Sequence, residues 1–97
     1  MKLIALEHER PGLSAADFQP HLSAEARQAW ALYRQGVIRE LYFRADRHTA
    51  VLVLECSSAA EAQAALDTLP LVQAGLIEFE LLPLEPYTGF SRLFVSS

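Results

Sequence analysis

The sequence has few of the features by which catalytic or metal-binding proteins are usually recognised. Its 97 residues include one cysteine, Cys56, so neither an internal disulfide nor a cluster of thiolate metal ligands can form. It contains no glycine-rich phosphate loop, no nucleophile elbow and no histidine pair at ligand spacing on one helix. These absences disfavour phosphoryl transfer, dinucleotide binding and zinc chemistry, and Cys56 is expected to be a small buried hydrophobe.

Clusters of positive charge and long apolar runs are missing as well. The net charge is -4, and lysine and arginine are not clustered, so nucleic acid is not an expected partner. No apolar run approaches the ~18 residues of a membrane span. The N-terminal segment reaches an acidic residue at Glu7, too early for a signal peptide. We therefore expect a cytoplasmic protein that does not contact membranes.

The chain is instead rich in apolar residues arranged as short elements of one domain, residues 1–97. Period-2 patterns predict strands at 2–9, 37–44, 48–55 and 76–84, the middle two joined as a hairpin by residues 45–47. Helical spacing predicts a helix from Pro20 to a stop at Gly36, and a second that begins with the capping pair Ser58 and Glu61 and ends at Pro70. Residues 10–19 are expected to form a loop. The order βαββαβ predicts a ferredoxin-like α+β fold, with both helices on one face of a four-stranded antiparallel sheet.

Apolar side chains on both faces of the middle strands predict self-association. Alternation places Ala50, Leu52 and Leu54 opposite Val51 and Val53 in the third strand. In the second strand it sets Val37, Arg39, Leu41 and Phe43 against Ile38 and Tyr42. Since two helices cover only one face, we expect the other face to pair with a second copy across a two-fold axis, giving a homodimer.

Residues 85–97 are expected to form a C-terminal arm. Tyr87, Phe90, Leu93 and Phe94 make this segment too apolar for a free tail. We expect the arm to pack on a neighbouring subunit; the alternative is an arm folded back over its own helices.

Titratable groups on apolar elements mark the candidate site. Arg39 would anchor an anionic small-molecule ligand, and Glu25 or Glu7 would act as an acid/base, with His21 as a second catalytic candidate. The alternative is a structural ion pair of Arg39 with Glu25 or with Glu7.

Other polar and aromatic side chains are weaker candidates for the ligand site. His48, Tyr42 and Trp30 are the further residues considered for substrate binding. As alternatives, His21 and His48 are surface or capping residues, Trp30 packs in the fold, and Tyr42 is a half-exposed strand residue.

Several segments of the chain resemble the muconolactone isomerase family. The likeness extends from about residue 22 to 84. Its most specific parts are the helix glutamate Glu25, the Gly36-Val37-Ile38-Arg39 entry to the second strand, and Leu69-Pro70-Leu71 before the last strand. The resemblance implies a dimeric α+β barrel that assembles into homodimers or larger rings. It also implies a proton shift along an unsaturated lactone carboxylate in aromatic catabolism, without metal or organic cofactor. Gln63, Ala50 and Val51 replace a histidine, an asparagine and a tyrosine of the isomerases, which predicts a differently lined pocket.

Three functions remain open from the sequence. The first is a cofactor-free, isomerase-like enzyme acting on a small anionic unsaturated lactone or related organic acid. The second is a non-enzymatic small-molecule-binding or accessory module, and the third is a cofactor-independent monooxygenase of the same fold.

Overall fold

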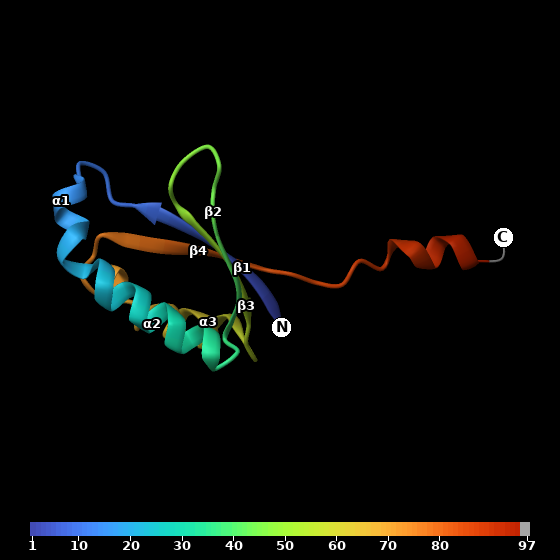
Figure 1. Cartoon of the computed structure of the whole chain (residues 1–97). Helices are drawn as coiled ribbons and strands as arrows, with labels where there is room; N and C mark the ends of the chain where they lie inside the picture. The colour runs from blue at the N-terminus through green and yellow to red at the C-terminus, as the bar shows by residue number, and fades with distance from the viewer. Residues whose placement is uncertain (96–97) are drawn as a thin grey trace.

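The fold is built on one four-stranded antiparallel sheet. The computed structural model describes residues 1–95. Its sheet has the order β2-β3-β1-β4, made of β1 (Lys2–Glu9), β2 (Ile38–Phe43), β3 (Ala50–Glu55) and β4 (Ile77–Pro83) (Figure 1). β1 lies in the interior of the sheet and pairs with both β3 and β4. The predicted ferredoxin-like α+β fold is thus confirmed.

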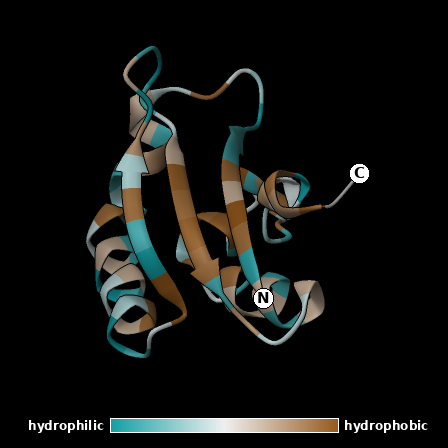
Figure 2. Cartoon of the chain, turned by 90° about the vertical axis from the view of Figure 1, so that its right-hand side faces the viewer, coloured by the Kyte–Doolittle hydropathy of each residue, from teal (hydrophilic) through white to brown (hydrophobic). Residues whose placement is uncertain are grey.

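The helices lie on one face of this sheet, behind the strands in Figure 2. The two longer ones are α2 (Leu22–Arg34) and α3 (Ala59–Leu66), and the short elements are α1 (Ala15–Phe18), η1 (Gln19–His21) and α4 (Pro70–Gln73). The sequence prediction was wrong at two points. Residues 10–19 are not all loop, and Pro70 begins α4 rather than ending α3. Proline suits the first turn of a helix, where its missing N–H would have no partner.

α2 ends as predicted, at Gly36. The N–H of Gly36 bonds the carbonyl of Tyr33, and the N–H of Val37 bonds the carbonyl of Leu32, both at 3.0 Å. This arrangement requires a left-handed residue, and Gly36 has φ of 81°. The turn aims the chain directly into β2.

The core lies between the sheet and the helices. Ala62 and Leu66 of α3 are buried, as is Leu69 just before α4. Cys56 is buried as expected, and burial raises the pKa of its thiol, which leaves it mostly protonated and unreactive. The other core residues are Leu3, Ala5, Leu32, Ile38, Leu52 and Leu54.

The side chains of β2 do not alternate regularly between the two faces of the sheet. A register shift between Ile38 and Glu40 gives this strand a bulge near Arg39. Ile38 pairs with Leu54 and Leu41 pairs with Leu52, so Ile38 and Leu41 share the helix-covered face instead of opposing each other. Sequence periodicity carries no sign of the extra residue, and the predicted placement of Ile38 and Leu41 on opposite faces was therefore wrong.

The helix-free face is apolar at its centre and charged around it. Ile4, Leu6, Val51 and Val53 lie half-buried there in β1 and β3. Charged residues on the flanking strands include Glu40, Glu78 and Glu80. The expectation of two apolar faces was made for the second and third strands. It holds for β3, whereas β2 is an edge strand that adds the carboxylate of Glu40 to the helix-free face.

The C-terminal arm leaves the body of the molecule. The N–H of Leu84 bonds the carbonyl of Lys2, and beyond this point the chain continues the line of β4 away from the helices (Figure 1). It ends in η2 (Gly89–Phe94), and the molecule measures 62 × 29 × 19 Å (Figure 1). The arm is therefore not folded back over its own helices. Among residues 1–95, no helix is long and apolar enough to cross a membrane.

Candidate functional site

Glu25 is a half-buried carboxylate in the first turn of α2. Its Oε1 accepts a hydrogen bond from the backbone N–H of Leu71 at 2.9 Å. That N–H belongs to the first turn of α4, where the helix offers it no internal partner. Burial raises the pKa of Glu25, against the opposing effects of this hydrogen bond and of His21.

Glu7 is a second half-buried carboxylate, on the helix-covered side of β1. Strand alternation places it in line with buried Leu3 and Ala5, and its Oε1 accepts the N–H of Ala50 at 3.0 Å. Burial also raises the pKa of Glu7, and the negative charge of Glu25 raises it further. The two carboxylates therefore lie within electrostatic reach of each other, and we call them the acidic pair.

Two histidines flank the acidic pair. His21 is half-buried at the end of η1, and its electrostatic effect lowers the pKa of Glu25. His48 lies on the β2–β3 connection, and its electrostatic effect lowers the pKa of Glu7. The His48 ring is exposed and stacks on Phe43, with centroids 3.8 Å apart. Glu7, Glu25, His21 and His48 thus lie on four separate segments, and electrostatic effects link Glu25 to His21 and Glu7 to His48.

Arg39 does not join this cluster. Its Nε donates to the carbonyl oxygen of Gly36 at 2.6 Å, at the far end of α2 from Glu25. A helix rises about 1.5 Å per residue, so most of the length of α2 separates the two side chains. Among residues 1–95, neither of the expected ion pairs of Arg39, with Glu25 or with Glu7, is formed.

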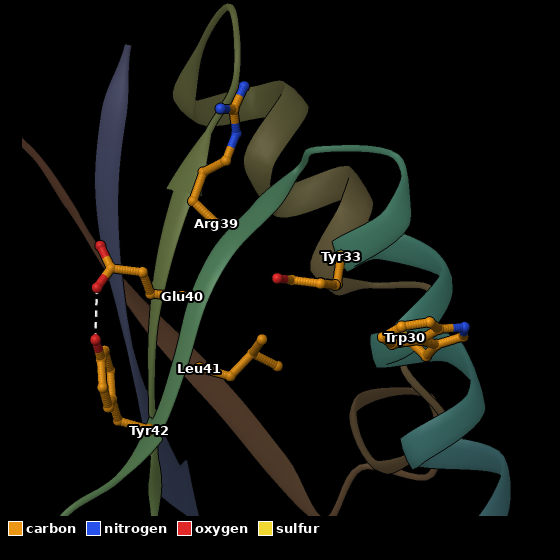
Figure 3. Close-up of a pocket in the computed structure, with 6 residues that line it drawn as sticks. All are labelled: Trp30, Tyr33, Arg39, Glu40, Leu41 and Tyr42. Carbon is orange, nitrogen blue, oxygen red and sulfur yellow. Dashed lines mark hydrogen bonds between the residues drawn. The ribbon is translucent and has the colours of Figure 1, made fainter.

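A surface groove lies beside Arg39, between α2 and β2 (Figure 3). Its volume is about 480 Å³. The Trp30 and Tyr33 rings stack with centroids 5.7 Å apart, and Tyr33 and Leu41 point toward each other across it. We call this the aromatic groove; it is lined by Trp30, Tyr33, Arg39, Glu40, Leu41 and Tyr42.

Tyr42 lies on the other side of β2 from Leu41. Its hydroxyl donates to Glu40 Oε1 at 2.5 Å (Figure 3), and this bond raises the pKa of the exposed phenol. The structure therefore divides the predicted site residues into two groups. Glu7, Glu25, His21 and His48 gather at the acidic pair, whereas Arg39, Tyr42 and Trp30 line the aromatic groove.

Three groups that contact the candidate site residues were not predicted from the sequence. The backbone N–H groups of Ala50 and Leu71 orient the acidic pair, and Phe43 supports His48. Pro70 was a usable signal for Leu71, since proline in a first turn is followed by N–H groups that need an outside acceptor. Residues 1–95 hold no cluster of three or more histidine, cysteine or acidic side chains suited to a metal ion.

Comparisons with known proteins agree with this fold. The family model described as muconolactone delta-isomerase matches residues 4–89. A crystal structure of muconolactone isomerase is similar, with 21% identity, a TM-score of 0.74, and coverage of 91% of this chain and 92% of that one. The 5-chloro-2-hydroxyhydroquinone dehydrochlorinase of Burkholderia phenoliruptrix, in complex with 2,5-dihydroxybenzoquinone, is 17% identical with a TM-score of 0.69. That match covers 92% of this chain and 98% of the other. No curated protein sequence matches the chain.

Proposed function

Since the chain belongs to the muconolactone delta-isomerase family, we propose that it is a catabolic enzyme that shifts a proton within a small anionic unsaturated lactone or a related organic acid. The observation that carries the proposal is the acidic pair, with Glu25 held by the N–H of Leu71 and Glu7 by the N–H of Ala50. Such a shift needs a base that removes a proton and returns it to another carbon.

Glu25 is the proposed acid/base. Its ionised carboxylate takes a proton from a ring carbon next to the carbonyl, which leaves a delocalised enolate. The resulting carboxylic acid then returns the proton to the far end of the conjugated system, so no net proton is consumed. Burial raises the pKa of Glu25, and a carboxylate with a raised pKa is a stronger base than an exposed one.

The groups around Glu25 have supporting roles in this proposal. The N–H of Leu71 fixes one carboxylate oxygen and leaves the other for the substrate. His21 and His48, when protonated, supply positive charge for a substrate carboxylate or enolate oxygen. Arg39, Tyr42 and Trp30 line the separate aromatic groove, so the proposal places no substrate carboxylate against Arg39.

The same base suits a second reaction. Loss of HCl from a chlorinated substrate also begins with removal of a proton, and one structural neighbour is named as a dehydrochlorinase. We therefore propose testing chlorinated hydroxyhydroquinones beside unsaturated lactone carboxylates. The proton goes to the base and chloride leaves, with no oxidant or reductant needed.

The test is turnover of this panel by the wild-type chain and by Glu25→Gln. Glutamine keeps the shape and can still accept from Leu71, but it cannot take a proton. We expect kcat to fall at least ~100-fold, the usual contribution of general acid–base catalysis. Activity that survives Glu25→Gln unchanged would remove Glu25 from the mechanism, and no turnover of any compound by the wild-type chain would favour a binding module.

Glu61→Gln is the matched control. Glu61 occupies the first turn of α3 as Glu25 occupies that of α2, but it is exposed and bonds the N–H of Ser57. Glutamine preserves this capping role. The control is therefore expected to retain wild-type kcat.

A further inference from the structure

We propose that His48, held in position by stacking on Phe43, anchors the carboxylate of the substrate. This inference rests on the proposed function, because it names the binding cation of the site at the acidic pair. An anionic substrate beside two carboxylates needs a positive partner, since like charges repel. Arg39 does not supply it, because its guanidinium lies at the far end of α2.

Two histidines are the positive groups that act on the acidic pair. Burial raises the pKa of both carboxyls, and the other charges that act on them differ in sign. Among residues 1–95, the positive charge that acts on Glu7 is His48, and the positive charge that acts on Glu25 is His21. The anchor for a substrate carboxylate is therefore one of these two side chains.

Their positions give the two histidines different roles. His21 is half-buried directly before α2 and acts on Glu25, the proposed base. The ring of His48 is exposed on the β2–β3 connection and acts on Glu7. A ligand can reach an exposed imidazole from solvent, and this one lies beside the carboxyl that is not the base. His48 therefore suits the substrate carboxylate, and His21 suits the charge that changes on Glu25.

The ring of His48 is held against Phe43. Their centroids are 3.8 Å apart and their planes differ by 22°. Phe43 pairs with Ala50 across the two strands, and the N–H of Ala50 bonds Glu7 at 3.0 Å, so one residue pair places both the stack and Glu7. The negative face of an aromatic ring also attracts a protonated imidazole. Phe43 is thus a positioning residue, and fixing the His48 ring in advance lowers the entropy lost on binding.

Hydrogen bonds brace the segment that carries His48. The N–H of Arg44 bonds the carbonyl of Thr49 at 2.9 Å, and the N–H of Thr49 bonds the carbonyl of Arg47 at 2.8 Å. The guanidinium of Arg44 binds both carboxylate oxygens of Asp46, at 2.9 and 2.7 Å. These contacts order the connection and pair the charge of Arg44 with that of Asp46.

Glu7 is the anion with which a substrate carboxylate competes for His48. Burial raises the pKa of Glu7, and the charges of Glu9 and Glu25 raise it further. At a given pH, Glu7 therefore carries less negative charge than the same group would carry without these effects. The competition is weakened accordingly.

Binding of a non-reactive ligand tests the anchor. The probe is a saturated γ-lactone carboxylate, which has no double bond to shift, and its uncharged amide is the matched ligand. Calorimetry at about pH 6, where an imidazole ordinarily carries positive charge, is expected to show about 10-fold weaker binding of the carboxylate to His48→Gln than to wild type. The amide is expected to bind both proteins alike. Equal affinity of the carboxylate for the two proteins would overturn the proposal, and so would failure of the wild-type chain to bind it.

Arg47→Gln is the matched control for the loss of one positive charge. Arg47 precedes His48 in the same connection and is exposed. Its charge is screened by solvent and salt, so the variant is expected to bind the carboxylate as the wild-type chain does. An equal loss of affinity in Arg47→Gln and His48→Gln would show a general effect of charge and would overturn the anchor.

Phe43→Leu tests the positioning role. It is expected to weaken binding of the carboxylate, and Phe43→Tyr, which keeps the ring, is expected to restore it. In the His48→Gln background, Phe43→Leu is expected to have no further effect, because it acts through His48. A further loss there would overturn the positioning role. Phe43 is 62% exposed, so these variants are expected to fold, which circular dichroism checks.

Kinetics separates this proposal from the proposed function. For an unsaturated lactone carboxylate, His48→Gln is expected to raise KM about 10-fold with little change in kcat, whereas Glu25→Gln lowers kcat. An unchanged KM in an active His48→Gln variant would overturn the anchor and leave Glu25 as the base. Activity that survives Glu25→Gln, with a KM that still depends on His48, would overturn the proposed base and leave the anchor in place.

Discussion

Glu25 Oε1 accepts the backbone N–H of Leu71 at 2.9 Å, which joins the first turn of α2 to the first turn of α4. One carboxylate therefore caps a helix that begins 45 residues later in the chain, at Pro70. Glu25 is half-buried, and burial raises its pKa although the hydrogen bond from Leu71 opposes this effect. The side chain proposed as the catalytic base is also a part of the fold.

Removal of this cap is expected to destabilise the chain. Glu25→Ala leaves the N–H of Leu71 without an acceptor in a partly buried place, which costs about 1–3 kcal/mol. Glu25→Gln keeps an acceptor oxygen and is expected to cost less. Urea denaturation of the two variants at one protein concentration measures the difference; equal stabilities would show that the hydrogen bond does not matter.

Stability is expected to depend on pH through the acidic pair. Burial raises the pKa of Glu7 and Glu25 above the unfolded value near 4.5, so the folded chain holds their protons to higher pH than the unfolded chain does. Their contribution is complete below the unfolded value and is lost as pH rises through the folded values.

The variant Glu7→Gln/Glu25→Gln removes this dependence. Its free energy of unfolding, relative to wild type, is expected to increase from about pH 4 to about pH 7, as urea denaturation would measure. Glu61→Gln, which makes the same change at an exposed carboxylate of α3, is the control. A constant difference in the double variant would contradict the burial of the pair.

Gly36 is expected to be irreplaceable by ordinary residues. It has φ of 81°, and the Arg39 guanidinium lies 3.8 Å from the place of an added Cβ. Gly36→Ala is expected to cost about 1–2 kcal/mol, and Gly36→Asn less, because asparagine tolerates this conformation. Thermal unfolding of both variants, with Gln35→Ala as a neighbour of ordinary helical conformation, checks the order.

The sequence predicted the fold because each element carried its own local signal. Gly36 marked the end of α2, and Ser58 marked the start of α3, where its Oγ accepts the N–H of Glu61 at 3.1 Å. Two of the errors arose where local patterns are ambiguous. Pro70 both ends and begins helices, and the bulge before Glu40 adds a residue without changing the apolar composition of β2.

The sequence indicated which residues are candidates for the site, but not how these residues are arranged in space. Glu7 and Glu25 stood out as carboxylates on apolar elements, yet their partners are backbone N–H groups, which every residue except proline carries. Arg39 was grouped with the two carboxylates because it is also a charged residue on an otherwise apolar strand. Its position at the far end of α2 depends on tertiary packing, which sequence spacing does not report.

The electrostatic contact within the acidic pair is itself measurable. The charge of Glu25 raises the pKa of Glu7, so Glu25→Gln is expected to lower the pKa of Glu7 while burial still keeps it elevated. Carbon-13 NMR titration of the Glu7 side-chain carboxyl follows this directly, and Glu61→Gln should leave it unchanged because Glu61 does not act on Glu7. A Glu7 titration unaffected by Glu25→Gln would mean that the two carboxylates are too far apart to share a substrate. The mechanism would then need a base that works without its neighbour.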